Sequence, residues 1–300
     1  MQHIWKAHLF LFITSIIQGF NFSIAKIVMP EYVSPGAIII IRGVSAALFF
    51  WLISLMMKTE KPVREDYPRL LFCTLTGIVL NQLLFYKGLS LTQPINASLM
   101  VTISPVMVLI ISALTLGERI NYKKILGIFL GAGGVVLLLL SSSRKGPENL
   151  FIGDLLILIN ATSYASFLVA VKPLMLKYHP ITVLKWIFLT GLIFVIPFGY
   201  PGIKNISWET MPGEAVLALL FVVVFATVIA YYLNTGVLKT IDPSLAGIYI
   251  YIQPILAAII AIAMGKDQLT VNKTLFSLMI LIGVYLVSSG QRQRKSLEPV

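Results

Sequence analysis

The residues of this chain that could do chemistry are polar side chains placed inside long apolar segments. Arg42 lies about eight residues into one such segment, too deep for its side chain to reach the membrane interface easily. Asn21, Asn81 and Asn160 lie well inside three others. A polar group is costly in hydrocarbon, so it tends to face a cavity or a neighbouring helix. The pattern is typical of a small-molecule binding cavity inside a helical bundle, with hydrogen bonds between helices as the alternative.

The expected cavity combines amide and aromatic side chains with one buried cation. Few acidic residues lie at membrane depth, so a carboxylate of the cargo is a candidate counter-ion for Arg42. The aromatic rings suit an apolar or aromatic part of a small molecule, and the amides would orient its polar end. The predicted cargo-binding residues are Asn21, Arg42, Asn81, Tyr86, Asn96, Thr102, Asn160, Tyr164, Tyr231, Tyr249, Tyr251 and Gln253.

Two prolines are predicted hinges of this site. Tyr249, Tyr251 and Gln253 alternate along the chain, and a regular helix would spread them over roughly 200°. All three can face one cavity only if Pro254 unwinds the helix locally. Pro105 is expected to act in the same way in another segment. An ordinary proline kink is the alternative for both positions.

The sequence lacks the constellations that catalysis or metal binding would need. The chain has 12 acidic residues, and all lie at expected helix ends, in loops or in the terminal tail. No two share a helical face within the membrane, so hydrolysis or phosphoryl transfer lacks its paired carboxylates. The three histidines have no metal-ligand spacing, and the single cysteine, Cys73, allows neither a thiolate cluster nor an internal disulfide. We therefore predict no enzyme activity, no cofactor and no metal.

The composition is that of an integral membrane protein. Hydrophobic residues make up 58% of the 300 residues and charged residues 12%, whereas soluble domains carry about 25% charged residues. A membrane-spanning helix needs about 20 apolar residues. We predict an all-α polytopic protein with ten transmembrane helices at 8–29, 34–57, 69–91, 94–116, 122–141, 153–176, 180–199, 214–237, 243–264 and 270–289.

The net charge of +11 is attributed to topology and to contacts with anionic membrane lipid. A nucleic-acid partner is not expected, because no basic segment with interleaved aromatic residues is present to bind one. With both termini inside, most Lys and Arg residues lie at cytoplasmic ends, and Arg144 and Lys145 are the exception. The charge pattern therefore predicts an N-in, C-in orientation, in a bacterial inner (plasma) membrane.

A long internal repeat relates the two halves of the chain. Four pairs of punctuating residues are each separated by 149 positions. Each half would hold five spans, and an odd number turns the second copy upside down, as in transporters built from inverted repeats. The expected units are 1–143 and 150–290, followed by a disordered cytoplasmic tail at 291–300. The four pairs are Pro94 and Pro243, Pro105 and Pro254, Glu118 and Asp267, and Gly134 and Gly283.

Short motifs in the first half resemble those of EamA-type carriers of the drug/metabolite transporter superfamily. The second half departs from the pattern, because Gly265–Lys266–Asp267 stands where Leu-Gly-Glu is expected. The resemblance implies ten helices in two halves, with helices 5 and 10 peripheral and the others around a central cavity. It also implies export. The motifs are Gly19–Phe20–Asn21 with Lys26, Pro35 and Arg42, and Leu116–Gly117–Glu118–Arg119 followed by Gly127, Gly131 and Gly134.

The sequence thus predicts a secondary transporter that moves a small metabolite, such as an amino acid, by alternating access of its two halves. A transporter of phosphorylated or nucleotide-linked sugars is one alternative, and it would need several convergent cations. A non-transporting membrane scaffold is another, and it would need no cavity. The expected oligomeric state is a monomer or a weak homodimer. Gly127 and Gly131 allow close helix approach, and we favour packing within the chain over a dimer contact.

Overall fold

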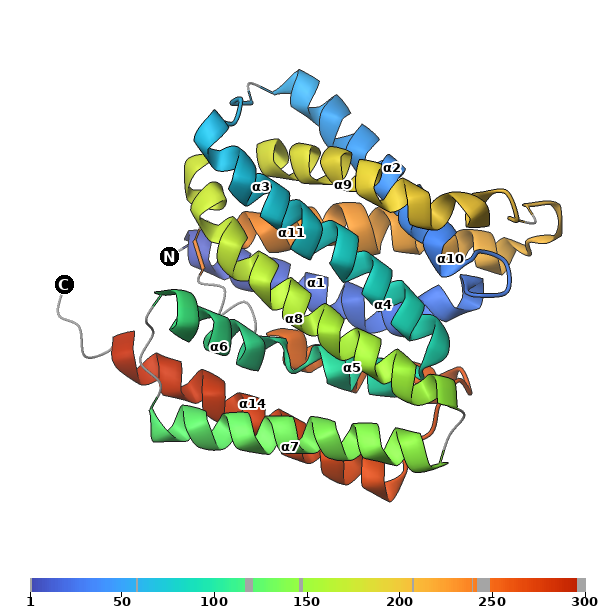
Figure 1. Cartoon of the computed structure of the whole chain (residues 1–300), viewed down its shortest axis with the longest axis vertical. Coiled ribbons are helices and arrows are strands. Elements are labelled where there is room, and N and C mark those ends of the chain that lie inside the picture. Colours follow the sequence, from blue (N-terminus) through green and yellow to red (C-terminus); the bar gives the residue numbers. More distant parts are fainter. Residues whose placement is uncertain are drawn as a thin grey trace.

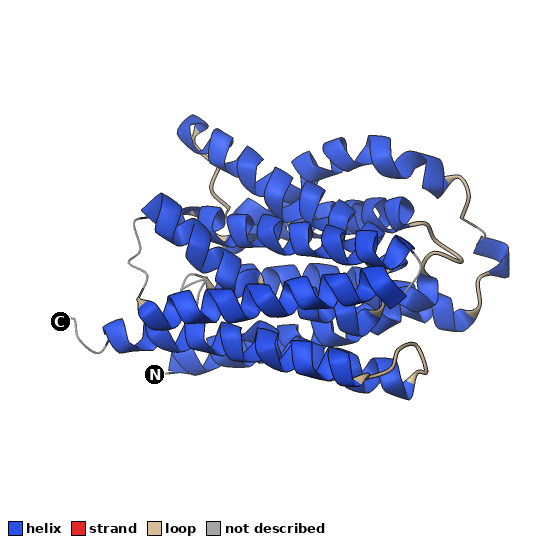
Figure 2. Cartoon of the chain, turned by 60° about the horizontal axis from the view of Figure 1, so that its bottom comes forward, coloured by secondary structure: helices blue, strands red, loops and turns tan. Residues whose placement is uncertain are grey.

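The computed structural model describes residues 2–57, 59–116, 121–145, 148–206, 208–238, 240–241 and 249–295. These residues form a helical bundle without strands (Figures 1 and 2). The helices are α1 (Gln2–Val28), α2 (Pro35–Met56), α3 (Tyr67–Thr74), α4 (Leu80–Leu91), α5 (Pro94–Val101), α6 (Ser104–Leu116), α7 (Tyr122–Lys145), α8 (Glu148–Lys177), α9 (Pro180–Ile203), α10 (Gly213–Val223), α11 (Ala230–Val237), α13 (Ile252–Ala263) and α14 (Val271–Lys295).

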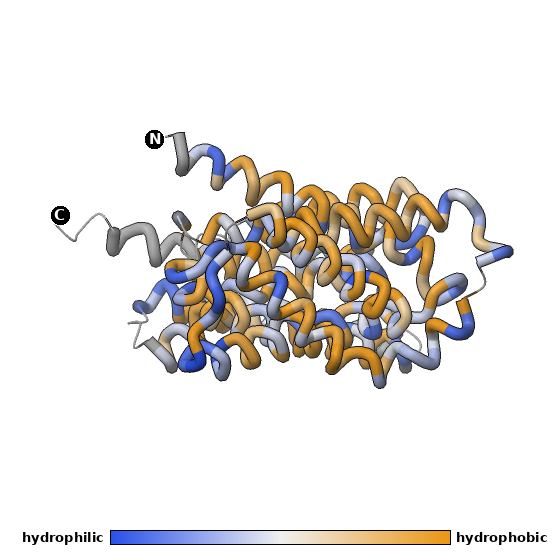
Figure 3. Tube along the Cα trace, turned by 90° about the horizontal axis from the view of Figure 1, so that it is seen from above, coloured by the Kyte–Doolittle hydropathy of each residue, from blue (hydrophilic) through white to orange (hydrophobic). Residues whose placement is uncertain are grey.

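The predicted all-helical membrane fold is confirmed. Within the described residues, eight helical stretches are long and apolar enough to cross a membrane, and two shorter apolar helices cover Tyr249–Ala263 and Val271–Val287. The first six residues of the predicted ninth span, 243–248, lie outside the described residues. Apolar residues fill the middle of the bundle's length, whereas hydrophilic residues gather at its two ends (Figure 3). This distribution matches a hydrocarbon layer between two aqueous phases.

Three helices begin at a proline because this residue has no N–H to leave unsatisfied in the first turn. They are α2 at Pro35, α5 at Pro94 and α9 at Pro180. Ser34 also caps α2, since its hydroxyl accepts a hydrogen bond from the Ala37 N–H at 3.2 Å. The helix starts are therefore fixed locally by residues that the sequence already shows.

Helices α7 and α14 form a close pair along one side of the bundle (Figure 1). A Cβ atom at Gly127 would lie 2.5 Å from the carbonyl oxygen of Gly283, so neither backbone leaves room for a side chain. Large apolar side chains on the other faces, such as Phe129 and Ile282, are exposed as expected for residues that face lipid. The glycines therefore serve packing within the chain, as favoured from the sequence.

The repeat spacing of 149 positions recurs in the backbone. Two five- to six-residue π-helical segments, which we call η2 (Leu75–Val79) and η4 (Val224–Ile229), begin at this separation. Helices α7 and α14, which begin at Tyr122 and Val271, do the same. Irregular features in register support a common structural origin for these two parts of the chain.

Two predicted boundaries differ from the structure. Helix α7 continues to Lys145, so Arg144 and Lys145 extend a helix rather than a loop. Helix α14 continues to Lys295, and the disorder predicted for 291–300 is therefore wrong for 291–295. Gln, Arg and Lys are good helix formers, which allows the helix to continue beyond its apolar part. Residues 296–300 lie outside the described part of the chain.

We expect Gly127→Ala to lower the thermal stability of the detergent-solubilised protein, because the added methyl group would collide with the backbone of Gly283. Overpacking of this kind costs about 1–3 kcal/mol. Gly133→Ala on the same helix is the matched control, since its Cβ would meet only Met279 at 3.9 Å. Equal melting temperatures for the two variants would contradict the close-packed seam.

Candidate functional site

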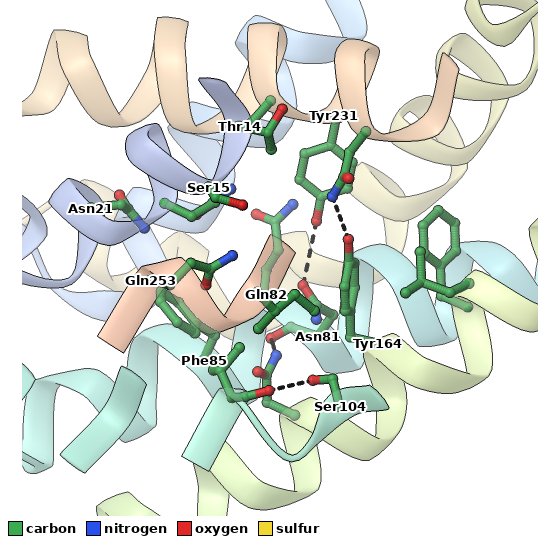
Figure 4. Close-up of a pocket in the computed structure, with 18 of the residues that line it drawn as sticks. Thr14, Ser15, Asn21, Asn81, Gln82, Phe85, Ser104, Tyr164, Tyr231 and Gln253 are labelled. Carbon is green, nitrogen blue, oxygen red and sulfur yellow. Dashed lines mark hydrogen bonds between the residues drawn. The ribbon is translucent and has the colours of Figure 1, made fainter. Parts of the chain in front are cut away.

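A cavity of about 100 Å³ lies in the centre of the bundle. Helices α1, α2, α4, α5, α6, α8, α11 and α13 contribute lining residues, with Tyr249 and Ile250 of a short 3₁₀ turn (Tyr249–Tyr251) before α13. Nearly all the polar side chains in Figure 4 point into this space. Among the described side chains of α7 and α14, none lines it. These helices are the fifth and tenth predicted spans, 122–141 and 270–289. The peripheral position expected for both is therefore observed.

Nine of the twelve residues predicted to bind cargo line this cavity. They come from both halves of the chain, which the fold brings together around one space. The nine are Asn21, Arg42, Asn81, Tyr86, Asn160, Tyr164, Tyr231, Tyr249 and Gln253.

Arg42 is held in place from two sides. Its Nε donates a hydrogen bond to Thr227 Oγ1 at 2.6 Å, and its Nη2 donates to the carbonyl oxygen of Ala226 at 3.2 Å. The guanidinium carbon lies 4.5 Å from the ring centroid of Tyr86, a cation–π geometry. Arg42 is only 4% exposed, and among the described residues no carboxylate lies within ion-pairing distance of it. The cavity thus carries a positive charge without a neutralising acid.

The π-helical segments supply the carbonyl groups that orient several polar side chains. In a π-helix the hydrogen-bond pattern shifts by one residue, which leaves carbonyl oxygens available to partners from outside the helix. In η4, the carbonyl oxygen of Ala226 accepts a hydrogen bond from Nη2 of Arg42. In η2, the oxygen of Gly77 accepts from the hydroxyl of Tyr231 at 3.0 Å, and that of Thr76 from Ser163 Oγ at 2.7 Å. Each segment therefore binds side chains from other helices beside the cavity.

Amide and tyrosine side chains extend this network along α4, α8 and α11. Asn160 Nδ2 donates to the backbone oxygen of Asn81 at 2.6 Å. Asn234 Nδ2 donates to the hydroxyl of Tyr164 at 2.6 Å, and Tyr231 lies 3.3 Å from Asn81 Oδ1 (Figure 4). The same residues therefore make hydrogen bonds between helices and line the cavity.

Several buried polar atoms at the cavity make no hydrogen bond of normal geometry to any described residue. They are Oδ1 of Asn21, both Oε1 and Nε2 of Gln82, and the hydroxyl of Tyr86. An unsatisfied buried polar group costs about 1–3 kcal/mol, so these groups need a partner, which water or a small molecule in the cavity can supply. They offer both donors and acceptors to a small molecule next to Arg42.

Three predicted site residues lie elsewhere. The hydroxyl of Tyr251 donates to the backbone oxygen of Val284 in α14 at 3.0 Å. Its neighbours Tyr249 and Gln253 line the cavity, so the alternating residues diverge as helical geometry requires. Asn96 Nδ2 donates to Asp154 Oδ2 at 3.1 Å, and Thr102 Oγ1 donates to the Ser98 carbonyl of its own helix at 2.8 Å. These three are therefore bound to protein partners outside the cavity.

The predicted hinges, Pro105 and Pro254, both lie in the first turn after a helix interruption. Helix α5 ends at Val101 and α6 begins at Ser104, so Pro105 is its second residue. Pro254 is the third residue of α13, which follows the 3₁₀ turn. Proline suits these positions because its missing N–H has no carbonyl to bind there.

Some lining residues were not predicted. Thr14 and Gln18 of α1 join Asn21 on one face, because residues spaced by three or four positions share a side of a helix. Gln82 and Asn234 lie beside predicted residues. The spacing of polar residues along α1 is the sequence signal that could have identified that face.

A polar network, which we call the end network, ties several helices together at one end of the bundle. Asp154, fully buried, accepts hydrogen bonds from Thr92 Oγ1 and from Asn96. Lys26 Nζ donates to the carbonyl oxygens of Leu89, at 3.0 Å, and of Thr92. These bonds join α1, α4, α5 and α8.

Asp267 extends the end network to α14. Its Oδ2 accepts from the Ile95 N–H at 3.1 Å, at the start of α5. Its Oδ1 lies 2.6 Å from Nζ of Lys273, which also donates to Gln93 Oε1 at 2.5 Å. A carboxylate at a helix N-terminus is favoured by the helix dipole. The sequence placed these acids at helix ends but gave no sign of their partners, which come from distant segments.

The fold and the cavity define a multi-pass helical membrane protein with a central polar cavity. The family model of the EamA-like transporter family matches residues 5–140 and 151–289. The chain therefore belongs to the EamA-like transporter family, and it is a membrane transporter.

Similar proteins agree with this class. An uncharacterized transporter of Archaeoglobus fulgidus is 29% identical over 96% of this chain and 99% of its own length. The uncharacterized transporter YyaM of Bacillus subtilis is 25% identical, over 97% and 95%. A WAT1-related protein of Arabidopsis thaliana is 24% identical, over 92% and 77%. The bacterial relative is consistent with an inner-membrane location.

The fold itself is also known from experiment. A solved crystal structure of a protein superposes with a TM-score of 0.66 at 18% sequence identity, covering 96% of this chain and 99% of that one. This likeness concerns the fold alone.

The cavity assignment predicts different thiol reactivity at two positions. With the buried Cys73 replaced by alanine, a cysteine at Asn81 should react with a water-soluble maleimide, because Asn81 lines the cavity. A cysteine at Tyr251, whose side chain contacts α14, should react at least tenfold more slowly. Mass spectrometry of the labelled protein measures both rates, and equal rates would contradict the assignment.

Proposed function

We propose that this protein is a secondary transporter that exports a small metabolite with a carboxylate group, such as an amino acid. The observation that carries the proposal is the cavity at Arg42, lined by residues of both halves and containing unpartnered polar atoms. Export is the direction that the family resemblance implies. The protein acts as a carrier and catalyses no covalent step.

Alternating access of two inverted halves is the proposed mechanism. The shared register of η2 with η4, and of α7 with α14, supports two related halves. The end network would hold one mouth of the cavity closed in the state described, and it would open when the halves exchange conformations. Both chain termini are proposed to lie in the cytoplasm, with the end network at the opposite face.

The two alternative functions fit the cavity less well. Phosphorylated and nucleotide-linked sugars carry two or more negative charges, whereas Arg42 is the one cation among the described residues that line this cavity. A scaffold that seals its polar residues between helices would have no use for unpartnered groups such as Gln82 at a cavity. A small carboxylate remains the better match.

Counterflow in proteoliposomes tests the proposed transport. Vesicles are loaded with a mixed panel of unlabelled amino acids, and entry of each labelled compound is followed without an ion gradient. We expect saturable entry of at least one compound, faster than in vesicles lacking the protein. Entry equal to that in empty vesicles for the whole panel would contradict amino-acid transport.

Asp267→Asn should weaken the closed mouth. The asparagine amide has one acceptor oxygen, whereas the carboxylate has two, and it lacks the negative charge that pairs with Lys273. We expect a cysteine at Asn21, on the cavity wall, to be labelled severalfold faster from the face that bears residue 267. Glu214→Gln is the control, because this carboxylate is exposed at the start of α10. A labelling rate no higher than in the control would rule out a gating role.

A further inference from the structure

We infer that the cavity selects its cargo by net charge and binds a singly charged organic anion, such as a hydroxy acid, in preference to a zwitterion with the same carbon skeleton. This inference rests on the proposed transport function and narrows its substrate class: an amino acid would be carried, but less well than the hydroxy acid with the same skeleton. Its basis is a charge asymmetry at the cavity: among the described residues that line it, Arg42 is the one ionised side chain, and none is Asp, Glu, Lys or His.

The guanidinium group of Arg42 retains donors for a carboxylate. An arginine side chain carries five N–H donors. The bonds to Thr227 and Ala226 occupy Nε and one position of Nη2, both toward η4, whereas Nη1 donates to no described residue. A planar guanidinium binds a carboxylate through parallel hydrogen bonds. Because Arg42 is almost fully buried, a charged partner gains more there than it would in water.

The groups around Arg42 suit a neutral hydrogen-bonding substituent. Gln82 presents an unpartnered donor and an unpartnered acceptor, and Asn21 presents an acceptor. The ring of Tyr86 lies under the guanidinium, and its hydroxyl has no partner. A hydroxyl or keto oxygen beside the carboxylate can bind these groups without carrying a charge into the cavity.

An ammonium group fits this arrangement poorly. Moving it out of water is expensive unless an anion compensates it. In the part of the lining that the structure describes there are amide and hydroxyl oxygens but no carboxylate, and Arg42 repels a second positive charge. Aromatic residues on the wall, including Phe85 and Phe167, suit the apolar part of the cargo. That part is the same in all compounds with one carbon skeleton. Charge therefore becomes the property that separates otherwise similar molecules.

Three compounds that share one carbon skeleton and differ in net charge test this inference in the counterflow assay. The compounds are 3-phenyllactate, phenylalanine and phenylalaninamide, with net charges of about −1, 0 and +1 at about pH 6, where the α-amino groups are protonated and the carboxylates ionised. We expect the ratio of maximal rate to half-saturating concentration to fall at least tenfold from the anion to the zwitterion and further to the cation. Arg42→Gln should remove this order, whereas Arg42→Lys should keep it at a lower rate, because only the second retains the charge.

Lys204→Gln is the matched control, because Lys204 is an exposed cation at the end of α9, outside the cavity lining. It should leave the order unchanged. Preference for the zwitterion, or an anion preference that persists in Arg42→Gln, would overturn the inference while leaving a working carrier. Absence of transport for all three compounds, and for the amino-acid panel, would overturn the proposed function as well.

Discussion

A permanent positive charge held inside an apolar bundle is the interaction on which the rest of this site depends. Arg42 of α2 lies against Tyr86 of α4 and donates hydrogen bonds to Thr227 and Ala226, which are both in η4. These contacts orient the guanidinium but do not neutralise it. Burying an uncompensated charge is costly, so the bundle keeps a polar cavity beside it rather than a packed core.

Backbone irregularity is the second element of the design. In hydrocarbon each carbonyl and N–H group needs a partner within the protein. The π-helical segments η2 and η4 meet this requirement through side chains, since Tyr231 binds Gly77 and Arg42 binds Ala226. A break between α5 and α6 precedes Pro105, and a 3₁₀ turn precedes Pro254. Non-helical backbone therefore occurs where it lines or supports the cavity, as in other carriers.

Much of the fold was predictable because a run of about 20 consecutive apolar residues indicates a membrane-spanning helix and its position in the chain. The existence of the spans, the starts at Pro35 and Pro94, and the close helix approach at Gly127 followed from such local signals, whereas the partner helix α14 did not. The π-helical segments were not predictable, because their carbonyl groups are satisfied by side chains from distant helices.

The site was predictable in composition but only partly in geometry. A polar residue at membrane depth can face the cavity or another helix, and sequence position alone does not separate these cases. Tyr251 contacts α14 and Asn96 contacts Asp154, although both resemble their cavity-lining neighbours in type and depth. The end network escaped prediction for the same reason, because Asp267 and Ile95 are far apart in the chain.

The central claim is that one cavity, lined by both halves, opens to each side of the membrane in turn. The most direct test is labelling of a cysteine at Asn81, in the Cys73→Ala background, with a membrane-impermeant maleimide applied to oriented vesicles from either face. Alternating access predicts reaction from both faces, with a saturating transported compound slowing both rates. Reaction from one face alone, whether or not a transported compound is present, would contradict it.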